Sequence, residues 1–417
     1  MTLFSARRQL PPTAGLTLQW RDLAGKRADF SACLAQELGI PPPLLTCSGT
    51  AALIIALRTL QQRQPDRCQV IVPAWTCPLV ALAAHHCPPL KIVPCDLAFG
   101  SINFDRQQLS QLCGPQTLAV VVTHLAGRIA DTEAVLNIAK PQRAAVIEDA
   151  AQSMGAKNAG KSVGLAGDMG FFSLAMGKGL TTVEGGVLFS HSAEIQRAMA
   201  RQIADDLPSH RGWELRRIAE LWGYRLMYHP DRLDWVYGRQ QRRALSRGDA
   251  VAAVGDDFTV NDIPLHTLGG YRQNVAAAAL ARFPAWQQEN RLRAQSRIGE
   301  LEQLPGVTVL QDGPQQQGVW PFLLVLMPDS TTRDYAMQRL WSAGLGVTRL
   351  FIHALSGYPT VLPFCLPTAT PNAEDFAARS LSISNSHWVE DRDFEQIIAV
   401  LRDALSRSVS RRKVNSC

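Results

Sequence analysis

The residues best suited to covalent chemistry lie around Lys178, which stands between Gly177 and Gly179 in the run FSLAMGKGLTTVEGG, residues 172–186. A lysine amine that is desolvated by its surroundings stays neutral more easily and can condense with an aldehyde to form a Schiff base. The same pattern is also typical of a lysine whose stem packs on a surface while its amine reaches water. The run therefore needs support from other segments.

A candidate anion site precedes it in the sequence. Ser48, Gly49 and Thr50 stand before a helical pattern over residues 51–60, which places Gly49 and Thr50 at a helix N-terminus. Free backbone N–H groups and the positive end of the helix dipole bind phosphate at such a position. The alternative interpretation is an ordinary Ser or Thr cap of the helix.

The third segment, AAVIEDAAQ over residues 144–152, has the apolar run of a buried parallel strand followed by polar side chains. Ligands of open α/β sheets bind beyond the carboxyl ends of the strands, where Asp149 and Gln152 are expected. An aspartate there can keep a pyridine nitrogen protonated, so that the ring accepts electrons from a substrate. A carboxylate that caps the next helix is the simpler alternative.

Together these segments resemble the DegT/DnrJ/EryC1/StrS sugar aminotransferases, a branch of the fold-type I pyridoxal phosphate enzymes. The resemblance also includes VIVPAWT at 70–76, THLAG at 123–127 and, more weakly, Gly270-Tyr271-Arg272. It implies that Lys178 binds pyridoxal 5'-phosphate as a Schiff base and that Asp149 pairs with the pyridine nitrogen, both as catalytic residues. The other cofactor contacts that it implies are Gly49, Thr50 and Ser173 at the phosphate, Gln152 near the phenolic oxygen, and Trp75 or Cys77 at the ring.

Three positions depart from the family pattern. The aromatic residue expected after the threonine of the VIVPAWT segment is Cys77, with Trp75 two residues earlier. The asparagine that reaches the partner subunit's phosphate is replaced by Gly270, and a glycine before Glu184 is replaced by Val183. These departures leave the ring contact open and make the substrate end unusual.

The resemblance implies an aminotransferase that moves an amino group from glutamate or glutamine to a keto sugar, nucleotide-linked, in amino-sugar, polysaccharide or secondary-metabolite biosynthesis. It further implies a homodimer, and His124 and His353 are additional candidates for substrate contact. One alternative is dehydration with the same cofactor, but the relatives that catalyse it replace the lysine by histidine, so Lys178 argues against it. The other is a non-catalytic regulatory or scaffold role, which Gly270 and Cys77 keep open.

The elements that position these residues predict an α/β fold. Strand-like runs at 70–72, 92–93, 118–122, 145–147, 170–173 and 187–189 alternate with helical patterns, as in a mostly parallel sheet. A second set follows, with a polar helix from 287, an apolar run at 322–326 and helices at 333–343 and 391–405. We therefore expect a large cofactor-binding domain over 1–286, a small α+β domain over 287–417, and a disordered tail over 406–417.

An insert at about 205–262 fits the family pattern poorly. Between residues 211 and 247 it holds nine arginines against four acidic residues, a net charge of +5, and six Trp and Tyr residues. Arginine and aromatic side chains suit a nucleotide diphosphate or an anionic membrane surface, so one hypothesis is a lid in which Arg216 and Arg217 bind a large anionic substrate. The alternative is a helical pair that packs on the body or on a second subunit.

Composition sets further limits. A net charge of +6 over 417 residues without a recognised motif is weak evidence for nucleic-acid binding, so none is expected. The nine cysteines form no Cys-x-x-Cys pair, which fits reduced thiols and no metal site. The N-terminus lacks a signal-like apolar core and no apolar stretch of 18 residues occurs, so we expect a soluble cytoplasmic protein.

Overall fold

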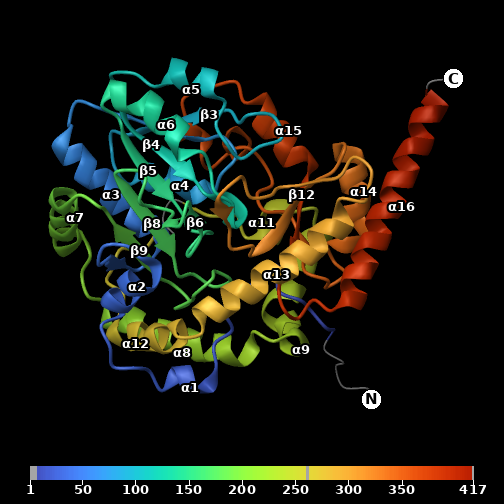
Figure 1. The fold of residues 1–417 in the computed structure, drawn as a ribbon, viewed down its shortest axis with the longest axis horizontal. Coiled ribbons are helices and arrows are strands. Elements are labelled where there is room, and N and C mark those ends of the chain that lie inside the picture. Colours follow the sequence, from blue (N-terminus) through green and yellow to red (C-terminus); the bar gives the residue numbers. More distant parts are fainter. Residues whose placement is uncertain (1–6, 260–262, 416–417) are drawn as a thin grey trace.

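A seven-stranded sheet organises the protein in the computed structural model, which describes residues 7–259 and 263–415 (Figure 1). Its strand order is β1-β9-β8-β5-β4-β2-β3. Strands β2, β3, β4, β5 and β8 are parallel, whereas β9 pairs antiparallel with β8 and β1 antiparallel with β9. The predicted mostly parallel sheet is therefore confirmed. The strands are β1 (Leu44–Thr46), β2 (Gln69–Pro73), β3 (Lys91–Cys95), β4 (Thr117–Thr123), β5 (Ala145–Asp149), β8 (Met169–Ser173) and β9 (Gly186–Phe189).

Helices cover both faces of this sheet, which is why its strands are continuous apolar runs rather than alternating ones. One face packs on α3 (Gly49–Arg63), α4 (Pro78–His85) and α7 (Ala193–Asp206). The opposite face packs on α5 (Arg106–Leu112) and α6 (Thr132–Ala139). Helices α2 (Phe30–Leu38) and α12 (Gly270–Leu280), with the short α1 (Trp20–Leu23) beside α12, extend the core next to β8 and β9.

The C-terminal part has its own four-stranded antiparallel sheet, in the order β10-β12-β14-β13. The boundary expected after residue 286 falls inside α13, and the two-domain division stays a prediction. The N-terminal segment packs with this part, since Leu10 lies in its core and Arg8 pairs with Asp393 at 2.8 Å. The elements are β10 (Thr308–Val309), β12 (Phe322–Leu326), β13 (Val347–Thr348), β14 (Ser380–Ser384), α13 (Phe283–Leu301), α14 (Ser330–Leu340), α15 (Pro371–Arg379) and α16 (Asp391–Asn415). A small third sheet joins β6 (Lys157–Asn158), β7 (Lys161–Ser162) and β11 (Gln316–Gln317).

The tail does not behave as expected from the sequence. Helix α16 continues to Asn415, so the prediction of disorder from 406 onward is wrong for the described residues. No Gly or Pro interrupts the chain after Asp391, and Arg407 pairs with Asp403 one turn earlier at 3.1 Å, which supports continuation of the helix. Residues 416 and 417 lie outside the described part.

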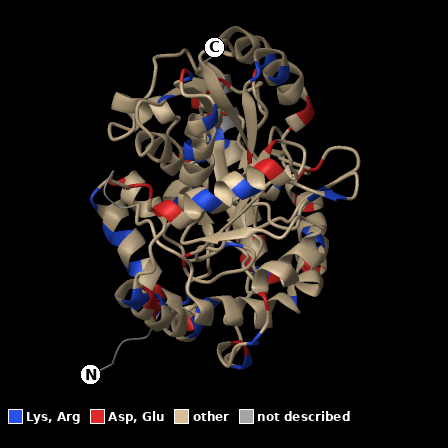
Figure 2. Cartoon of the chain, turned by 90° about the vertical axis from the view of Figure 1, so that its left-hand side faces the viewer, with Lys and Arg blue, Asp and Glu red and all other residues tan. Residues whose placement is uncertain are grey.

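The insert is helical, and in Figure 1 its first helix lies beside α12, whereas α11 lies nearer the middle of the molecule. It consists of α8 (Arg211–Met227), α9 (Pro230–Leu233), the π-helix η3 (Asp234–Gly238), α10 (Arg239–Ser246) and α11 (Ala250–Val254). Residues 260–262 of the predicted insert lie outside the described residues. On the side seen in Figure 2, basic and acidic residues are interspersed along the helices. None of the helices in the described part combines the length and apolar character needed to span a membrane.

Candidate active site

A cavity of about 470 Å³ opens at the carboxyl ends of the parallel strands, where the sequence predicted a ligand. It brings together residues that are far apart in the chain, because α3 begins at this edge of the sheet and β5 and β8 end there. The predicted residues that line it are Gly49, Thr50, Cys77, His124, Asp149, Gln152, Ser173 and Lys178.

The N-terminus of α3 supplies backbone donors to this cavity. Ser48 caps the helix, since its hydroxyl accepts the N–H of Ala51 at 3.0 Å. Among the described residues, the N–H groups of Gly49 and Thr50 have no hydrogen-bond acceptor. A Cβ atom at Gly49 would lie 3.2 Å from the Cβ of Ser173, so glycine lets the helix end approach β8 closely. This end of the cavity is therefore built for an anion.

Asp149 is the last residue of β5 and Gln152 follows it, and both side chains are held by backbone amides. One Asp149 oxygen, Oδ1, accepts the N–H of Ala151 at 3.0 Å. Burial raises the pKa of Asp149, against the opposing effects of that amide and of Lys178. The Oε1 atom of Gln152 accepts the N–H of Ala126 at 2.8 Å, which leaves its Nε2 group as a donor toward the cavity.

Lys178 has the setting that Schiff-base chemistry requires. Within the described part of the chain, its amine has neither a hydrogen-bond nor a salt-bridge partner. Burial lowers the pKa of Lys178, although the nearby Cys77 and Asp149 act in the opposite direction. The amine consequently deprotonates more readily than an ordinary lysine, and a neutral amine is the nucleophile that attacks an aldehyde.

His124 lines the same cavity but is bonded within the protein. Its Nδ1 accepts the N–H of Ala130 at 3.1 Å, so Nε2 carries the proton and donates to Glu148 at 2.8 Å. Burial would raise the pKa of Glu148, but His124 and the amides of Gly164 and Gly167 outweigh it and lower that pKa. Because both ring nitrogens are bonded, His124 can offer a ligand only its ring carbons.

Of the two residues predicted as alternatives at the cofactor ring, Trp75 does not line the cavity. Its indole is 1% exposed and packs on Phe351 and Phe376, with ring centroids 5.5 and 4.6 Å apart. The chain turns into α4 after Trp75 and directs this side chain into the core rather than the cavity. Cys77 lines the cavity instead, and burial raises the pKa of its thiol to about 12, which keeps it neutral.

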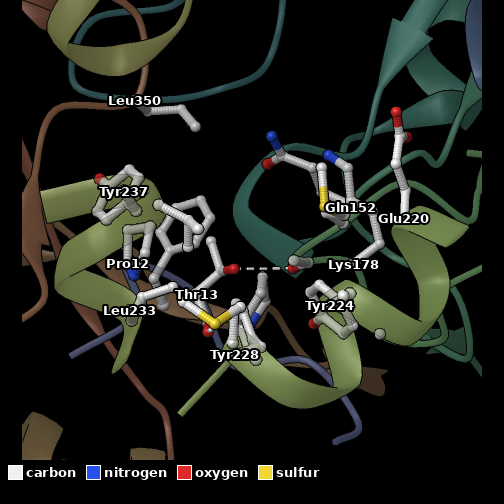
Figure 3. Close-up of a pocket in the computed structure, with 18 residues that line it drawn as sticks. Pro12, Thr13, Gln152, Lys178, Glu220, Tyr224, Tyr228, Leu233, Tyr237 and Leu350 are labelled. Carbon is white, nitrogen blue, oxygen red and sulfur yellow. Dashed lines mark hydrogen bonds between the residues drawn. The ribbon is translucent and has the colours of Figure 1, made fainter. Parts of the chain in front are cut away.

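A second cavity, of about 590 Å³, lies on the other side of Lys178 (Figure 3). Gln152, Met176, Lys178 and Leu350 line both cavities, so the two meet at the lysine. In Figure 3, Lys178 and Gln152 face Tyr237 and Leu233 across this space, and Thr13 donates to the Gly177 carbonyl at 2.8 Å. Helices α8 and α9 and the π-helix form much of the wall, with Glu220, Gly223, Tyr224, Met227, Tyr228, Leu233, Val236 and Tyr237.

The two arginines expected to bind substrate lie elsewhere. Arg217 donates to Glu184 at 2.6 Å and also pairs with Glu220, whereas Arg216 is mostly exposed and pairs with Glu220 at 2.9 Å. Neither lines either cavity. Arg217 thereby joins α8 to Glu184 of the loop after Lys178, whereas Arg216 is paired within α8, so neither lies in the predicted place beside a substrate.

His353 is also placed differently from the prediction. It lines a separate cavity of about 500 Å³ together with Arg333 and Arg349. Burial, with a smaller contribution from Arg349, lowers the pKa of His353. The turn after β13 carries its side chain away from Lys178, so His353 is no contact of either cavity described above.

Other lining residues were not singled out from the sequence. Asp256 and Phe258, just after α11, line the cavity of about 470 Å³, and the Tyr358 hydroxyl donates to Asp256 at 2.8 Å. Burial raises the pKa of Asp256 to about 7. Pro12 and Thr13, from the N-terminal segment, line the cavity of about 590 Å³. None of these residues stands in a motif, and only the aromatic content of the insert pointed toward this wall.

The comparison with known families decides the classification. The DegT/DnrJ/EryC1/StrS aminotransferase family matches residues 13–211 and 272–402, most of the chain. The chain belongs to this family. The unmatched segment between the two blocks contains α9 to α11 and all of α8 except Arg211, so the helices that wall the cavity of about 590 Å³ lie outside the matched part of the chain. Helices α8 to α11 are called the added helices.

Similar proteins are aminotransferases and a related sugar-modifying enzyme. An L-glutamine:2-deoxy-scyllo-inosose aminotransferase of Micromonospora echinospora is 34% identical over 46% of this chain and 47% of its own length. GDP-perosamine synthase of Caulobacter vibrioides is 31% identical over 44% and 49%. The alignments thus span about half the length of these relatives.

Solved structures confirm the fold. A putative sugar aminotransferase of Streptococcus pneumoniae has a TM-score of 0.74 at 15% identity, covering 97% of this chain and all of that one. An aminotransferase of Streptoalloteichus hindustanus has a TM-score of 0.73 at 20% identity, covering 96% and 100%. The predicted fold-type I architecture of the DegT/DnrJ/EryC1/StrS family is therefore confirmed.

The departures from the family pattern have structural consequences. Val183 has a φ of 71°, the left-handed region that favours the glycine expected there. Gly270 opens α12, and two residues later the fully buried Arg272 binds Glu214 of α8 at 2.6 Å. The Gly270-Tyr271-Arg272 segment thus anchors the added helices of this family member.

Proposed function

We propose that this protein is a pyridoxal 5'-phosphate-dependent aminotransferase in which Lys178 carries the cofactor. The observation that supports this most directly is a lysine amine that has no hydrogen-bond or salt-bridge partner in the described residues. It lies where the cavity of about 470 Å³, the donor-rich cavity, meets the cavity of about 590 Å³, the apolar cavity. Its lowered pKa fits the same role. Membership in an aminotransferase family whose members use this cofactor agrees with it.

The residues of the donor-rich cavity fit the cofactor group by group. The unoccupied N–H groups of Gly49 and Thr50 and the hydroxyl of Ser173 suit its phosphate. Asp149, with one oxygen fixed by an amide, suits a protonated pyridine nitrogen, and the Nε2 group of Gln152 suits a phenolic oxygen. Cys77 and His124 present uncharged walls.

When bound, the cofactor supplies an electron sink that makes the α-hydrogen of an amino acid acidic. Asp149 supports this by keeping the ring nitrogen protonated, since a buried carboxylate beside it stabilises the positive charge. Lys178, once its amine is free, would move a proton from the α-carbon of the donor to C4′ of the cofactor in the first half-reaction, and from C4′ to the former keto carbon of the acceptor in the second.

We further propose that the amino donor is glutamate or glutamine and that the acceptor is a keto sugar or a related cyclic ketone. The inosose aminotransferases among the relatives use L-glutamine according to their names, which supports this donor. An amino-sugar pathway, a homodimer and a cytoplasmic location remain parts of the same proposal. Among the described residues that line the apolar cavity, Lys178 is the only cation that a nucleotide-linked acceptor could meet.

The proposal is tested by the visible absorbance of the purified protein with pyridoxal phosphate, before and after glutamate or glutamine. The wild type and Lys161→Ala, an exposed-lysine control, should form the bound-cofactor band and lose it with a donor, whereas Lys178→Ala should not form it. Borohydride reduction followed by peptide mass spectrometry gives a second readout, with the added mass on the Lys178 peptide. A band that no donor bleaches would favour the non-catalytic alternative, and absence of any band would refute cofactor binding.

A further inference from the structure

We propose that the cavity walled by the added helices binds the part of the acceptor that lies beyond its keto-bearing ring, and that this part is uncharged and largely apolar. This inference rests on the proposed function. It assigns the role of substrate selection to α8, α9 and the π-helix, which lie outside the part of the chain that matches the family. A nucleoside diphosphate group is the alternative that it rejects.

The position of the cavity makes it the approach to the reacting centre. Lys178 and Gln152 belong to its lining and to that of the donor-rich cavity, so a ketone carbonyl placed beside Lys178 has its body in the apolar space. At about 590 Å³ this space has the size of an ordinary small-molecule site. Figure 3 shows Tyr224, Tyr228 and Tyr237 on helices of the insert around it.

The chemistry of the wall is apolar. Met176, Met227, Leu233, Val236 and Phe322 provide aliphatic and aromatic surface. The tyrosines add ring faces, and the hydroxyl groups of Tyr228 and Tyr237 are hydrogen-bonded within the protein. Tyr228 donates to the Thr13 carbonyl at 3.3 Å, and Tyr237 accepts from Gln241 at 3.0 Å. Tyr224 stacks on Tyr228 with ring centroids 4.4 Å apart.

Phosphate recognition would require groups that this wall does not have. Lys178 is the only basic residue in the lining among the described residues, and it is needed for the cofactor. The one acidic lining residue, Glu220, would repel a diphosphate, and it is the partner of Arg216 and Arg217. Arg217 is thereby bonded to Glu184 and Glu220, Arg216 is bonded to Glu220, and neither arginine lines the cavity. A diphosphate buried here would lose its hydration without gaining a charged partner.

Opposite charges at one site distinguish the two classes of acceptor. Val236 lines the cavity and is 46% exposed, so both Val236→Lys and Val236→Glu should fold. The matched controls are Leu226→Lys and Leu226→Glu, because Leu226 is 45% exposed on the neighbouring helix and does not line the cavity. The probes are 1-phenylpropan-2-one and a dTDP-linked 4-keto-6-deoxyhexose, added to enzyme already aminated with glutamate.

For an uncharged acceptor, both Val236 variants should slow the second half-reaction by roughly 3- to 10-fold with the aryl ketone, since either charge opposes apolar contact. Both Leu226 variants should leave it unchanged. If instead Val236→Lys speeds and Val236→Glu slows reaction of the dTDP sugar, the proposal is overturned. Failure of the wild type to bind the aryl ketone at millimolar concentration by calorimetry would also overturn it.

The two proposals fail in different ways. If glutamate does not bleach the cofactor band, the aminotransferase function is refuted, and calorimetry with the aryl ketone still tests the cavity. If bleaching occurs but the charge variants respond with opposite signs, only the acceptor inference is refuted.

Discussion

Replacing Gly186 by alanine should weaken cofactor binding without touching the cofactor. Gly186 begins β9 beside the residue that caps α3, and a Cβ atom there would lie 2.2 Å from the Ser48 carbonyl oxygen and 2.3 Å from Thr46 Oγ1. Because these atoms belong to the backbone and to a buried side chain, removing the clash requires a shift of about 1 Å in the N-terminus of α3. Overpacking of this kind typically destabilises the folded state by about 1–3 kcal/mol. The anion site formed by Gly49 and Thr50 moves with it.

Loss of well-aligned hydrogen bonds to a charged group is worth about 1.5–3 kcal/mol, so Gly186→Ala should raise the dissociation constant for pyridoxal phosphate by roughly 10- to 100-fold. Equilibrium titration by absorbance measures this, and urea unfolding of the apoprotein measures the cost in stability. Gly299→Ala is the matched control, since Gly299 is exposed within α13 with no atom within 4 Å of its added Cβ. It should gain about 0.5–1 kcal/mol and bind normally. Native stability and affinity in Gly186→Ala would refute the reasoning.

Three further predictions follow from the same structure. Val183→Gly should lower the free energy of unfolding, measured in urea, by about 1–2 kcal/mol less than Val187→Gly. Both variants lose a buried valine side chain, but only Val183→Gly removes a side chain from a left-handed backbone conformation. Equal losses would show that the φ of 71° stores no strain. Asp149→Asn should slow bleaching by glutamate at least about 100-fold while cofactor affinity changes less than about 10-fold, as measured by stopped-flow absorbance and titration; an unchanged rate would exclude its role at the ring nitrogen. Burial acts to raise the pKa of Glu184, but hydrogen bonds from Trp213 and Arg217 outweigh it and lower that pKa. The ionised Glu184 therefore stabilises the folded state fully above the ordinary Glu range, and this stabilisation is lost as the pH falls through the lower folded pKa. The difference in unfolding free energy between wild type and Glu184→Gln should therefore shrink between about pH 6 and about pH 3, and a constant difference would refute this.

The strand pattern and the central residues of the site could be predicted because their signals are local. A parallel strand that is buried on both faces must be apolar along its length, as in β4, and polar residues that follow such strands meet at one edge. This reasoning brought Asp149, Gln152 and Lys178 to one cavity with the start of α3, as the structure confirms.

The contacts of single side chains could not be predicted in the same way. Trp75 and Cys77 stand two residues apart after β2, and the sequence does not say which one the turn into α4 directs inward. Arg217 matched an anion-binding pattern, yet a carboxylate of the loop after Lys178 already occupies it. Such outcomes depend on partners that are distant in the chain.

The sequence by itself determined the family, the mostly parallel sheet and the choice of Lys178 as the candidate reactive residue, because periodicity, helix-start chemistry and motif order are properties of neighbouring residues. Only the tertiary structure decided that the added helices place Tyr224, Tyr228 and Tyr237 at the cavity, and that Arg217 contacts carboxylates outside it. That choice is made by long-range pairs such as Glu214 with Arg272 and Glu184 with Arg217, which fix the rotation of α8 against the body. The resulting apolar wall beside Lys178 is therefore a property of the packed molecule and not of any segment within it.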